Sequence, residues 1–446
     1  MLTENWHTLS PEDKYAERMK TWMAGSGLEF ATPAAKQHYQ QRALWIRDAI
    51  ELRKPERVPI CPFVGTYPAR YAGVTMREAM YDYEKLATAI RKFHADFELD
   101  GYLSAATYTP GRVLDLLDYK LYQWPGHGVG EDQGYQTVEA EYMLAEEYDL
   151  LLQDPTGYWM QRYLPRVFGA LEAWQGIPDL TGILEIPNVG PAMAAFGTPA
   201  VQQSLQALMD AGRVALEWRQ AVAAIDTEIR ATHGIPAFRG GFSKAPFDII
   251  GDTLRGTRPM MFDLFRRPAK VLEAVERFVP KAVAMGVRTS TLSGNPMVFM
   301  PLHKGVDSFM STKDFEKFYW PTLEAVILGL IEEGCVPMLF VEGTYNSRLD
   351  TLAKARLPEG RTLWIFEGTD MREAKAKIGG WGCIGGNVPG SLLNAATPQD
   401  VDRYVTDLLE GTAHNGGFIL GTGVSLSEAR AENFQAMIQA GRRYGA

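Results

Sequence analysis

The feature that most constrains the fold is a repeated alternation of a helix, a glycine and four to six apolar residues. It recurs before the runs NPMVFMPL, CVPMLFVEG, RTLWIFEG, GCIGGN and GGFILGTG. Such units are typical of buried parallel strands that alternate with helices. We predict a (β/α)8 TIM barrel rather than an open doubly wound sheet, because no glycine-rich phosphate loop follows an early strand.

The chain is predicted to divide into a helical extension and one barrel. Residues 1–54 should form helices that pack on the barrel, because KQHYQQRALWIRDAIELRK has apolar residues at helical spacing. Residues 55–446 should form the barrel, with its first strand near RKPERVPICPF. The polar and aromatic stretch at about 110–160 is predicted to be an insertion above the barrel.

Composition excludes several classes of protein. The 446 residues are 46% hydrophobic and 22% charged, with a formal net charge of −9, which argues against a nucleic-acid binder. The start, MLTENWHTLSPEDK, has no apolar targeting segment, so we expect a cytoplasmic protein without a membrane partner. Three scattered cysteines are too few for a disulfide framework or a four-thiolate zinc site.

Polar residues at predicted strand ends are the candidate site, because barrel chemistry lies at the C-terminal ends of strands. Each has a structural alternative: a carboxylate can cap the next helix or pair with an arginine such as Arg348, and a cysteine can act as a small apolar residue. The candidates are Arg239, Ser243, Lys244, Asp248, His303, Lys304, Glu342, Glu367, Asp370, Cys383 and Asn387.

A group of aromatic residues has two equally favoured interpretations. Tyr102, Tyr108, Tyr119, Tyr122 and Trp124 can be core residues, or they can lie over the barrel mouth and bind a flat aromatic substrate. We carry Tyr102, Tyr108 and Trp124 forward as predicted substrate-binding residues.

The opening strand ELRKPERVPICPF and residues 250–423 resemble the uroporphyrinogen decarboxylase superfamily. Segments such as FVEGTYNSRLD, CIGGNVPGSLL and YQTVEAEYMLAEEYD are similar to its corrinoid-linked methyltransferases, and in particular to the methyltransferase components of anaerobic O-demethylases. The resemblance implies a barrel of the uroporphyrinogen decarboxylase type.

The residues that would bind uroporphyrinogen have changed. The decarboxylases carry an arginine-bearing M-R-Q-A-G-R loop after the first strand, whereas this chain reads CPFVGTYPAR, with Arg70 as the nearby guanidinium. The decarboxylase S-D-I and G-H-G stretches correspond here to GYLSAATYTP and GTG. Without these charges a tetrapyrrole polyanion is not the expected substrate.

The methyltransferase branch uses zinc, which the resemblance also implies here. Its H-x-C pair corresponds to EGTYN, and its final cysteine corresponds to Gly423. The O-demethylase components use carboxylates and a cysteine near G-N-V-P, so Glu342, Glu367 and Cys383 are the predicted ligands of a catalytic zinc with an open position.

The leading hypothesis is methyl transfer from a methoxylated, aromatic small molecule to cobalamin that a separate corrinoid protein supplies. Glu342, Glu367, His303 and Arg239 are the predicted catalytic residues, and Asn387 and Arg70 join the three aromatics as substrate-binding residues. The alternative is a metal-free decarboxylase or lyase that acts on a small carboxylate through Arg239, Lys244 or His303. A degenerate barrel that only binds a partner is a third hypothesis, and we leave a homodimer open.

Overall fold

The structure, a computed structural model, describes residues 5–355 and 357–444. Its main sheet is parallel, with strands in the order β4-β5-β6-β7-β8-β9. Strands β5 to β9 are buried along their whole length, which explains their continuous apolar sequences. The strands are β4 (Gly241–Phe242), β5 (Met297–Leu302), β6 (Val336–Val341), β7 (Leu363–Phe366), β8 (Cys383–Val388) and β9 (Phe418–Thr422).

Two further segments close this sheet into a ring of eight. Ile60 forms a parallel bridge with Leu420 of β9, and Tyr102 forms one with Ala237 of the segment that leads into β4. The backbone N–H of Asp100 donates to the carbonyl of Ile60 at 2.9 Å, which joins the two added segments to each other. The predicted (β/α)8 barrel is therefore confirmed.

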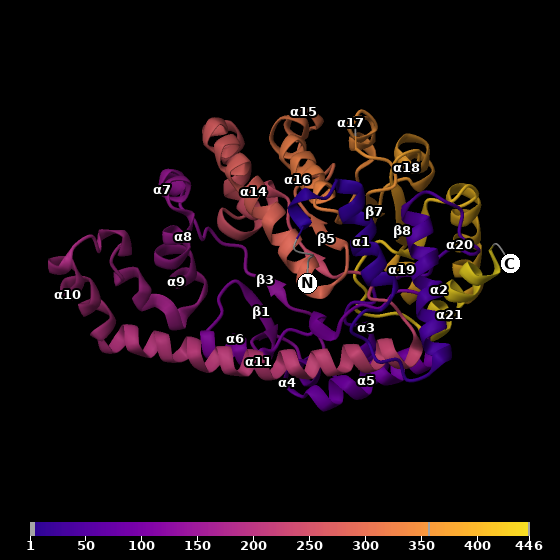
Figure 1. Cartoon of the computed structure of the whole chain (residues 1–446), viewed down its shortest axis with the longest axis horizontal. Coiled ribbons are helices and arrows are strands. Elements are labelled where there is room, and N and C mark those ends of the chain that lie inside the picture. Colours follow the sequence, from indigo (N-terminus) through magenta and orange to yellow (C-terminus); the bar gives the residue numbers. More distant parts are fainter. Residues whose placement is uncertain (1–4, 356, 445–446) are drawn as a thin grey trace.

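Helices surround this ring on the outside, as Figure 1 shows. No described helix has the length and apolar character needed to cross a bilayer. The helices around the barrel are α3 (Tyr67–Tyr71), α4 (Met76–Tyr81), α5 (Tyr83–Asp96), α13 (Thr257–Arg266), α14 (Pro268–Ser293), α16 (Trp320–Glu332), α17 (Leu349–Ala353), α18 (Met371–Ile378), α19 (Gly390–Ala395), α20 (Pro398–Thr412) and α21 (Ala431–Arg443).

Four phenylalanines fill the middle of the barrel. Phe63 contacts Phe340, Phe299 and Phe238, with ring centroids 4.5, 5.7 and 5.9 Å apart. Burial of each ring contributes about 1.5–3 kcal/mol to stability. This aromatic plug separates the two ends of the barrel.

The N-terminal helices α1 (Pro11–Met23) and α2 (Pro33–Ile50) cover the N-terminal end of the barrel. Ser10 caps α1 by accepting the N–H of Asp13, as residues of its type do at helix starts. The indole N–H of Trp22 donates to the carbonyl of Ala237 at 3.0 Å, and Arg42 on α2 donates to the carbonyl of Gly234 at 2.8 Å. Both contacts fall where the chain enters the third strand of the ring.

The connection between the second and third strands of the ring runs from about residue 104 to 235, so it extends beyond the stretch at 110–160. It contains α6 (Gly111–Leu117), a small sheet of β1 (Tyr122–Pro125), β2 (Gly128–Val129) and β3 (Gln136–Thr137), and α7 (Tyr148–Gln153), α8 (Pro155–Tyr158), α9 (Leu164–Val167) and α10 (Ile186–Ala194).

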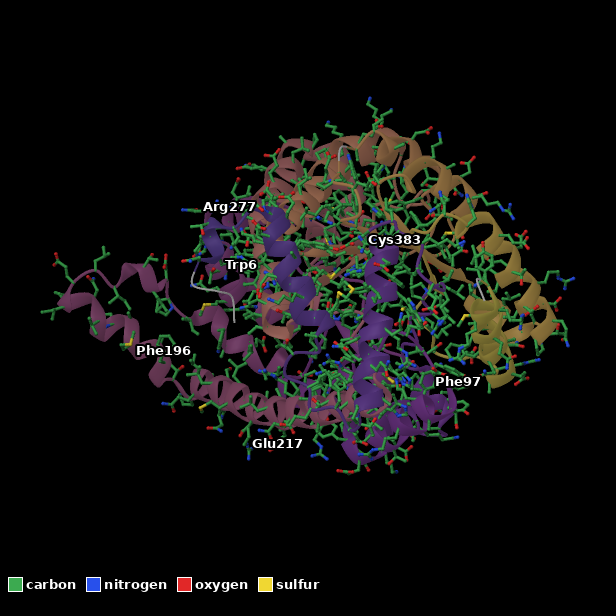
Figure 2. The ribbon with its side chains drawn as sticks, turned by 45° about the vertical axis from the view of Figure 1, so that its right-hand side comes forward. Trp6, Phe97, Phe196, Glu217, Arg277 and Cys383 are labelled. Carbon is green, nitrogen blue, oxygen red and sulfur yellow. The ribbon has the colours of Figure 1, made fainter. Side chains whose placement is uncertain are left out.

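The long helix α11 (Pro199–His233) returns this connection to the barrel, while α10 lies at the far end of the molecule (Figure 1). Figure 2 shows Phe196 on this projecting arm and Cys383 within the barrel. Gly234 follows the last residue of α11 and has a φ of +60°, and an added Cβ there would clash with the carbonyl of Ala35. Glycine is therefore needed where α11 turns back against α2.

Candidate active site

The polar residues that follow β5, β6 and β7 lie side by side at the C-terminal end of the barrel. The three strands end at the same level of their hydrogen-bonded ladder, so the next residues, His303, Glu342 and Glu367, are neighbours. Nε2 of His303 lies 3.5 Å from Oε2 of Glu342, and the backbone N–H of Gly343 donates to the carboxylate of Glu367. The structure thus brings three of the predicted catalytic residues together.

Asp252 holds the other side of the His303 ring. Its carboxylate lies 2.5 Å from Nδ1 of His303, and it also pairs with Lys244 at 2.9 Å and with Lys304 at 3.2 Å. The imidazole therefore lies between Asp252 and Glu342, and the two lysines add positive charge around the buried carboxylate.

This arrangement favours the imidazolium form of His303. Burial opposes the charge, but the hydrogen bonds to Asp252 and Glu342 outweigh it and raise the pKa of His303 to about 10. For Asp252, burial raises the pKa, yet the hydrogen bond with His303 and the charge of Lys244 hold it well below its usual range. At neutral pH the site therefore presents a proton donor that a carboxylate orients.

Asp248 fixes the backbone beneath His303. It is buried at the end of α12 (Pro246–Asp248), where its two carboxylate oxygens accept the backbone N–H groups of His303 and Lys304, each at 3.0 Å. The hydroxyl of Tyr319 donates to the same carboxylate at 2.8 Å. Two of these contacts hold the loop after β5, and the third joins Asp248 to Tyr319 of η9 (Phe315–Tyr319). Asp248 therefore positions the backbone that carries the imidazole.

Arg239 lies at the same end of the barrel, over the aromatic plug. Its guanidinium carbon is 4.7 Å from the ring centroid of Phe299, and Nη2 donates to the hydroxyl of Thr107 at 3.4 Å. Burial lowers the pKa of Arg239, and the nearby Tyr135 partly offsets this. Among residues 5–355 and 357–444, no carboxylate lies within ion-pair distance of this guanidinium.

The predicted role of Cys383 as a zinc ligand is corrected by its position. Cys383 begins β8 and pairs with Leu363, the first residue of β7, whereas Glu367 follows the last. At about 3.3 Å per residue the two levels are roughly 13 Å apart. The thiol is fully buried, which raises its pKa to about 12, and Figure 2 shows it inside the barrel.

The predicted zinc set therefore does not fit, because Glu342 and Glu367 lie at the opposite end of the barrel from Cys383. Within the described part of the chain, no three His, Cys, Asp or Glu residues are grouped so that they could hold a metal ion.

The predicted substrate-binding aromatics are also corrected, because they belong to a second hydrophobic cluster between α11 and helices α4 and α5. The hydroxyl of Tyr102 donates to Asp226 of α11 at 2.6 Å, and that of Tyr108 to the carbonyl of Thr66 at 3.1 Å. Trp124 is 5% exposed and packs in the same cluster. Their polar groups are satisfied outside the barrel ring, so these side chains support the long helix.

Asn387 and Arg70 are likewise occupied elsewhere. The Asn387 amide donates to the backbone carbonyls of Glu367 and Thr369, each at 3.2 Å, and this ties the ends of β7 and β8 together. Arg70 is exposed and pairs with Glu428 at 3.1 Å. In this structure Asn387 joins the ends of two strands and Arg70 forms a surface ion pair, and their contact with a substrate stays a prediction.

Asp252 is the functional residue that the sequence reasoning missed. It lies in the irregular helical turn η8 (Ile249–Leu254), four residues after Asp248. A spacing of four places two side chains on one helical face, so the stretch DIIGD carries a signal that both carboxylates face the end of β5.

Comparisons with known proteins agree with this architecture. A search of curated protein sequences finds no match. A methyltransferase from Methanosarcina mazei has a similar structure, with a TM-score of 0.57 and 13% identity over 92% of this chain and 99% of that one. A cobalamin-independent methionine synthase from a Shewanella species, in complex with selenomethionine, covers 46% of this chain and 61% of its own at 11% identity, but its TM-score of 0.32 carries no argument.

The family model of uroporphyrinogen decarboxylase matches residues 185–444. This range includes β4 to β9 and the residues around His303, so it covers the part of the ring that forms the candidate site. The match extends over more than half of the sequence and confirms the superfamily that the motifs predicted. The chain belongs to the uroporphyrinogen decarboxylase (URO-D) family.

Proposed function

We propose that the protein is a methyltransferase that takes a methyl group from a methoxylated, aromatic substrate and passes it to a corrinoid held by a separate protein. The observation that carries this proposal is the position of the His303 ring between Asp252 and Glu342, which favours its protonated form. An ether oxygen leaves readily only if the charge that develops on it is neutralised. The fold shared with a Methanosarcina mazei methyltransferase is consistent with this reaction.

In this reaction the bond between the methyl carbon and the oxygen breaks, and its electron pair stays on the oxygen. The Nε2–H of His303 then gives its proton to that oxygen, and the product leaves as a neutral hydroxyl. Asp252 accepts the Nδ1–H and fixes the ring. Glu342 is half exposed beside Nε2, so its carboxylate can yield its place to the substrate oxygen.

The partner's corrinoid, when bound, supplies the nucleophile that accepts the methyl group. We assign no step to zinc, because Glu342 and Glu367 lack the predicted third ligand at their end of the barrel. The contribution of this chain is therefore to orient the ether and to donate a proton to the reacting oxygen.

The test is phenol release from a panel of aryl methyl ethers, with and without carboxylate groups, in the presence of free cob(I)alamin. We expect release that needs both the protein and cob(I)alamin, measured by chromatography. A release rate no greater than that of cob(I)alamin alone for every ether would contradict the proposal.

A metal-free decarboxylase is the second candidate, and Arg239, whose guanidinium has no acid partner among the described residues, favours it. Such a cation can hold a carboxylate while His303 protonates the carbon that carbon dioxide leaves. The two candidates differ in product: decarboxylation releases carbon dioxide without cob(I)alamin, whereas methyl transfer leaves every carboxylate of the substrate in place.

A further inference from the structure

The end of the connection farthest from the barrel exposes apolar side chains. Of the residues from Pro178 to Ala200, all of which the structure describes, none is buried. This stretch includes all of α10, and Figure 1 shows that helix at the far end of α11. The side chains of Leu184 and Ile186 are 82% and 90% exposed. Exposed apolar surface of this extent marks an interaction site. We call residues 178–216 the arm.

The first half of α11 continues this exposed surface. Leu205, Met209, Gly212 and Leu216 follow one another at spacings of four, three and four residues, so they lie along one face of the helix. Met209 and Leu216 are 62% and 57% exposed. Another face of the helix packs on η5 (Gly169–Gly176) and on α6. The face that carries Met209 therefore remains open to a further molecule.

Gly212 is not required by the packing of its own chain. It is exposed in the interior of a helix, where glycine is less favourable than alanine. Its φ is not positive, and a Cβ added there would meet nothing within 4 Å among the described residues. The close approach of another molecule to the helix at this point would explain the glycine.

This face of α11 is complementary to a second copy of itself. When two identical helices pack antiparallel through a seam of this spacing, Met209 of each copy lies against Gly212 of the other, and Leu205 of each lies against Leu216 of the other. The long methionine side chain then fills the space beside the glycine. Because two-fold symmetry repeats every contact, this fit of a large residue against a small one occurs twice.

The exposed apolar area of the arm is of the size that a stable dimer needs. The large apolar side chains that it exposes are Leu180, Leu184, Ile186, Val189, Met193, Met209 and Leu216, and on average they are more than half exposed. A side chain of this type presents roughly 60–120 Å² when it is uncovered, so together they present on the order of 400 Å². A standard interface buries about 800 Å² on each partner, somewhat more than half of it apolar.

The charges of the arm favour a second copy over a membrane surface. Residues 180–209 carry a single charged side chain, Glu185, although the whole chain has a net charge of −9. Neither lysine, arginine nor histidine occurs between Arg166 and Arg213, whereas binding to an anionic membrane relies on basic residues. Two copies of the chain therefore repel each other least where their arms meet.

We propose that the protein forms a two-fold symmetric dimer through the arm, with the two α11 helices antiparallel and Met209 of each copy packed against Gly212 of the other. This register places Pro199, where α11 begins, opposite Val222 of the other copy. Helix α10 therefore lies beside the body of the other copy instead of in solvent. The proposal goes beyond the proposed reaction and does not depend on it.

Analytical ultracentrifugation of the full chain, without substrate or cobalamin, tests the proposal. We expect a species of twice the mass of the chain that dissociates on dilution, with a dissociation constant on the order of 1 μM or below, as for a standard interface. A protein that sediments only as a monomer at about 50 μM, well above that constant, would overturn the proposal.

Leu216→Glu locates the contact, and Leu292→Glu is its matched control. Both positions are exposed leucines on a helix, the second on α14. Arg213 and Arg219 lie three residues to either side of Leu216, so glutamate suits the isolated helix there. In the dimer it would be buried against Leu205 of the other copy, and association should weaken at least tenfold. Leu292→Glu should associate like the unchanged protein. Circular dichroism verifies the fold of both variants, and equal association of the two would overturn the proposal.

Gly212→Leu separates close packing from general adhesion of an apolar surface. A leucine adds apolar area to the arm, so a non-specific apolar contact would become stronger. In the proposed dimer the leucine occupies the space of Met209 of the other copy, and association should weaken at least tenfold. The substitution leaves the fold of one copy intact, because the space around Gly212 is open. Unchanged or stronger association of Gly212→Leu would contradict the antiparallel packing.

Discussion

The two ends of the barrel treat charged groups in opposite ways. At the N-terminal end, Asp100 accepts two bonds from Arg57 at 2.7 and 2.6 Å and the backbone N–H of Ile60 at 2.8 Å, and helix α2 adds Arg42. At the C-terminal end, Arg239 has no acid partner in the described part of the chain. The C-terminal end also has paired charges around Asp252, so the difference lies in one group: every arginine at Asp100 has an acid partner, whereas Arg239 has none among the described residues.

The largest loss of stability is expected from breaking the ion pairs of Asp100 at the N-terminal end of the barrel. Asp100→Asn leaves Arg57 and Arg42 without their buried counter-ion, which should lower the free energy of unfolding by about 3–5 kcal/mol. Urea denaturation measures this change. Glu98→Gln, which removes a more exposed partner of Arg42, should cost less than about 1 kcal/mol, and equal losses in the two variants would contradict the comparison.

At the ligand end, His303→Gln should slow cob(I)alamin-dependent phenol release by about a hundredfold, because general acid catalysis contributes at least that much. The urea midpoint should fall as well, because Asp252 loses the imidazolium and keeps only its two lysines, so the rates are compared under conditions in which both proteins are folded. His127→Gln is the control, because His127 forms a surface pair with Asp115. A release rate unchanged in His303→Gln would show that His303 is not the proton donor.

The pH dependence sharpens the comparison further. The folded pKa of His303 is about 10, above the value of about 6.5 for a free imidazole, so its stabilising effect is complete below pH ~6.5 and is lost as the pH rises towards 10. For Asp252, whose pKa is lowered, the stabilising effect is present above about pH 3.9 and is lost as the pH falls.

Asp252→Asn should therefore move the pKa of His303 down towards the free value and bring the alkaline loss of activity to lower pH. Titration of the imidazole by NMR measures the first effect, and the pH profile of phenol release measures the second. An unchanged pKa of His303 in the variant would show that the carboxylate of Asp252 does not stabilise the protonated imidazole.

The smallest effect is expected inside the barrel, at Cys383. Because its thiol is buried and remote from the site, Cys383→Ala should cost about 1 kcal/mol of stability and leave phenol release unchanged. Thermal unfolding and the release assay measure the two quantities. If the variant lost most of its activity at unchanged stability, the thiol would instead take part in the reaction.

The sequence predicted the barrel well because its buried strands are continuous apolar runs between glycine-ended helices. The positions of His303, Glu342 and Glu367 also follow from it, since each is the first residue after such a run, whereas their catalytic roles stay a prediction. Cys383 was misplaced because an apolar run does not show at which residue its strand begins: β8 starts at the cysteine, so the thiol enters the barrel at the other end.

The aromatic residues were misplaced for a different reason. Tyrosine and tryptophan suit both a ligand site and a helix interface, and only the position of α11 decides between the two. Tyr102 faces Asp226 of that helix, a contact across 124 residues that no local pattern reveals. Asp252 was missed because it lies on an irregular turn rather than at a strand end.

The strands of the ring are joined less continuously on one side than on the other. Strands β5 to β9 are joined by continuous ladders, whereas the segments around Ile60, Tyr102 and Ala237 are held by isolated bridges. Arg239 lies between Ala237 and β4, and β4 pairs with β5, the strand that leads to His303. The candidate site is therefore on the continuous side, and the segments around Ile60 and Tyr102 are the part of the ring that should open at the lowest free energy.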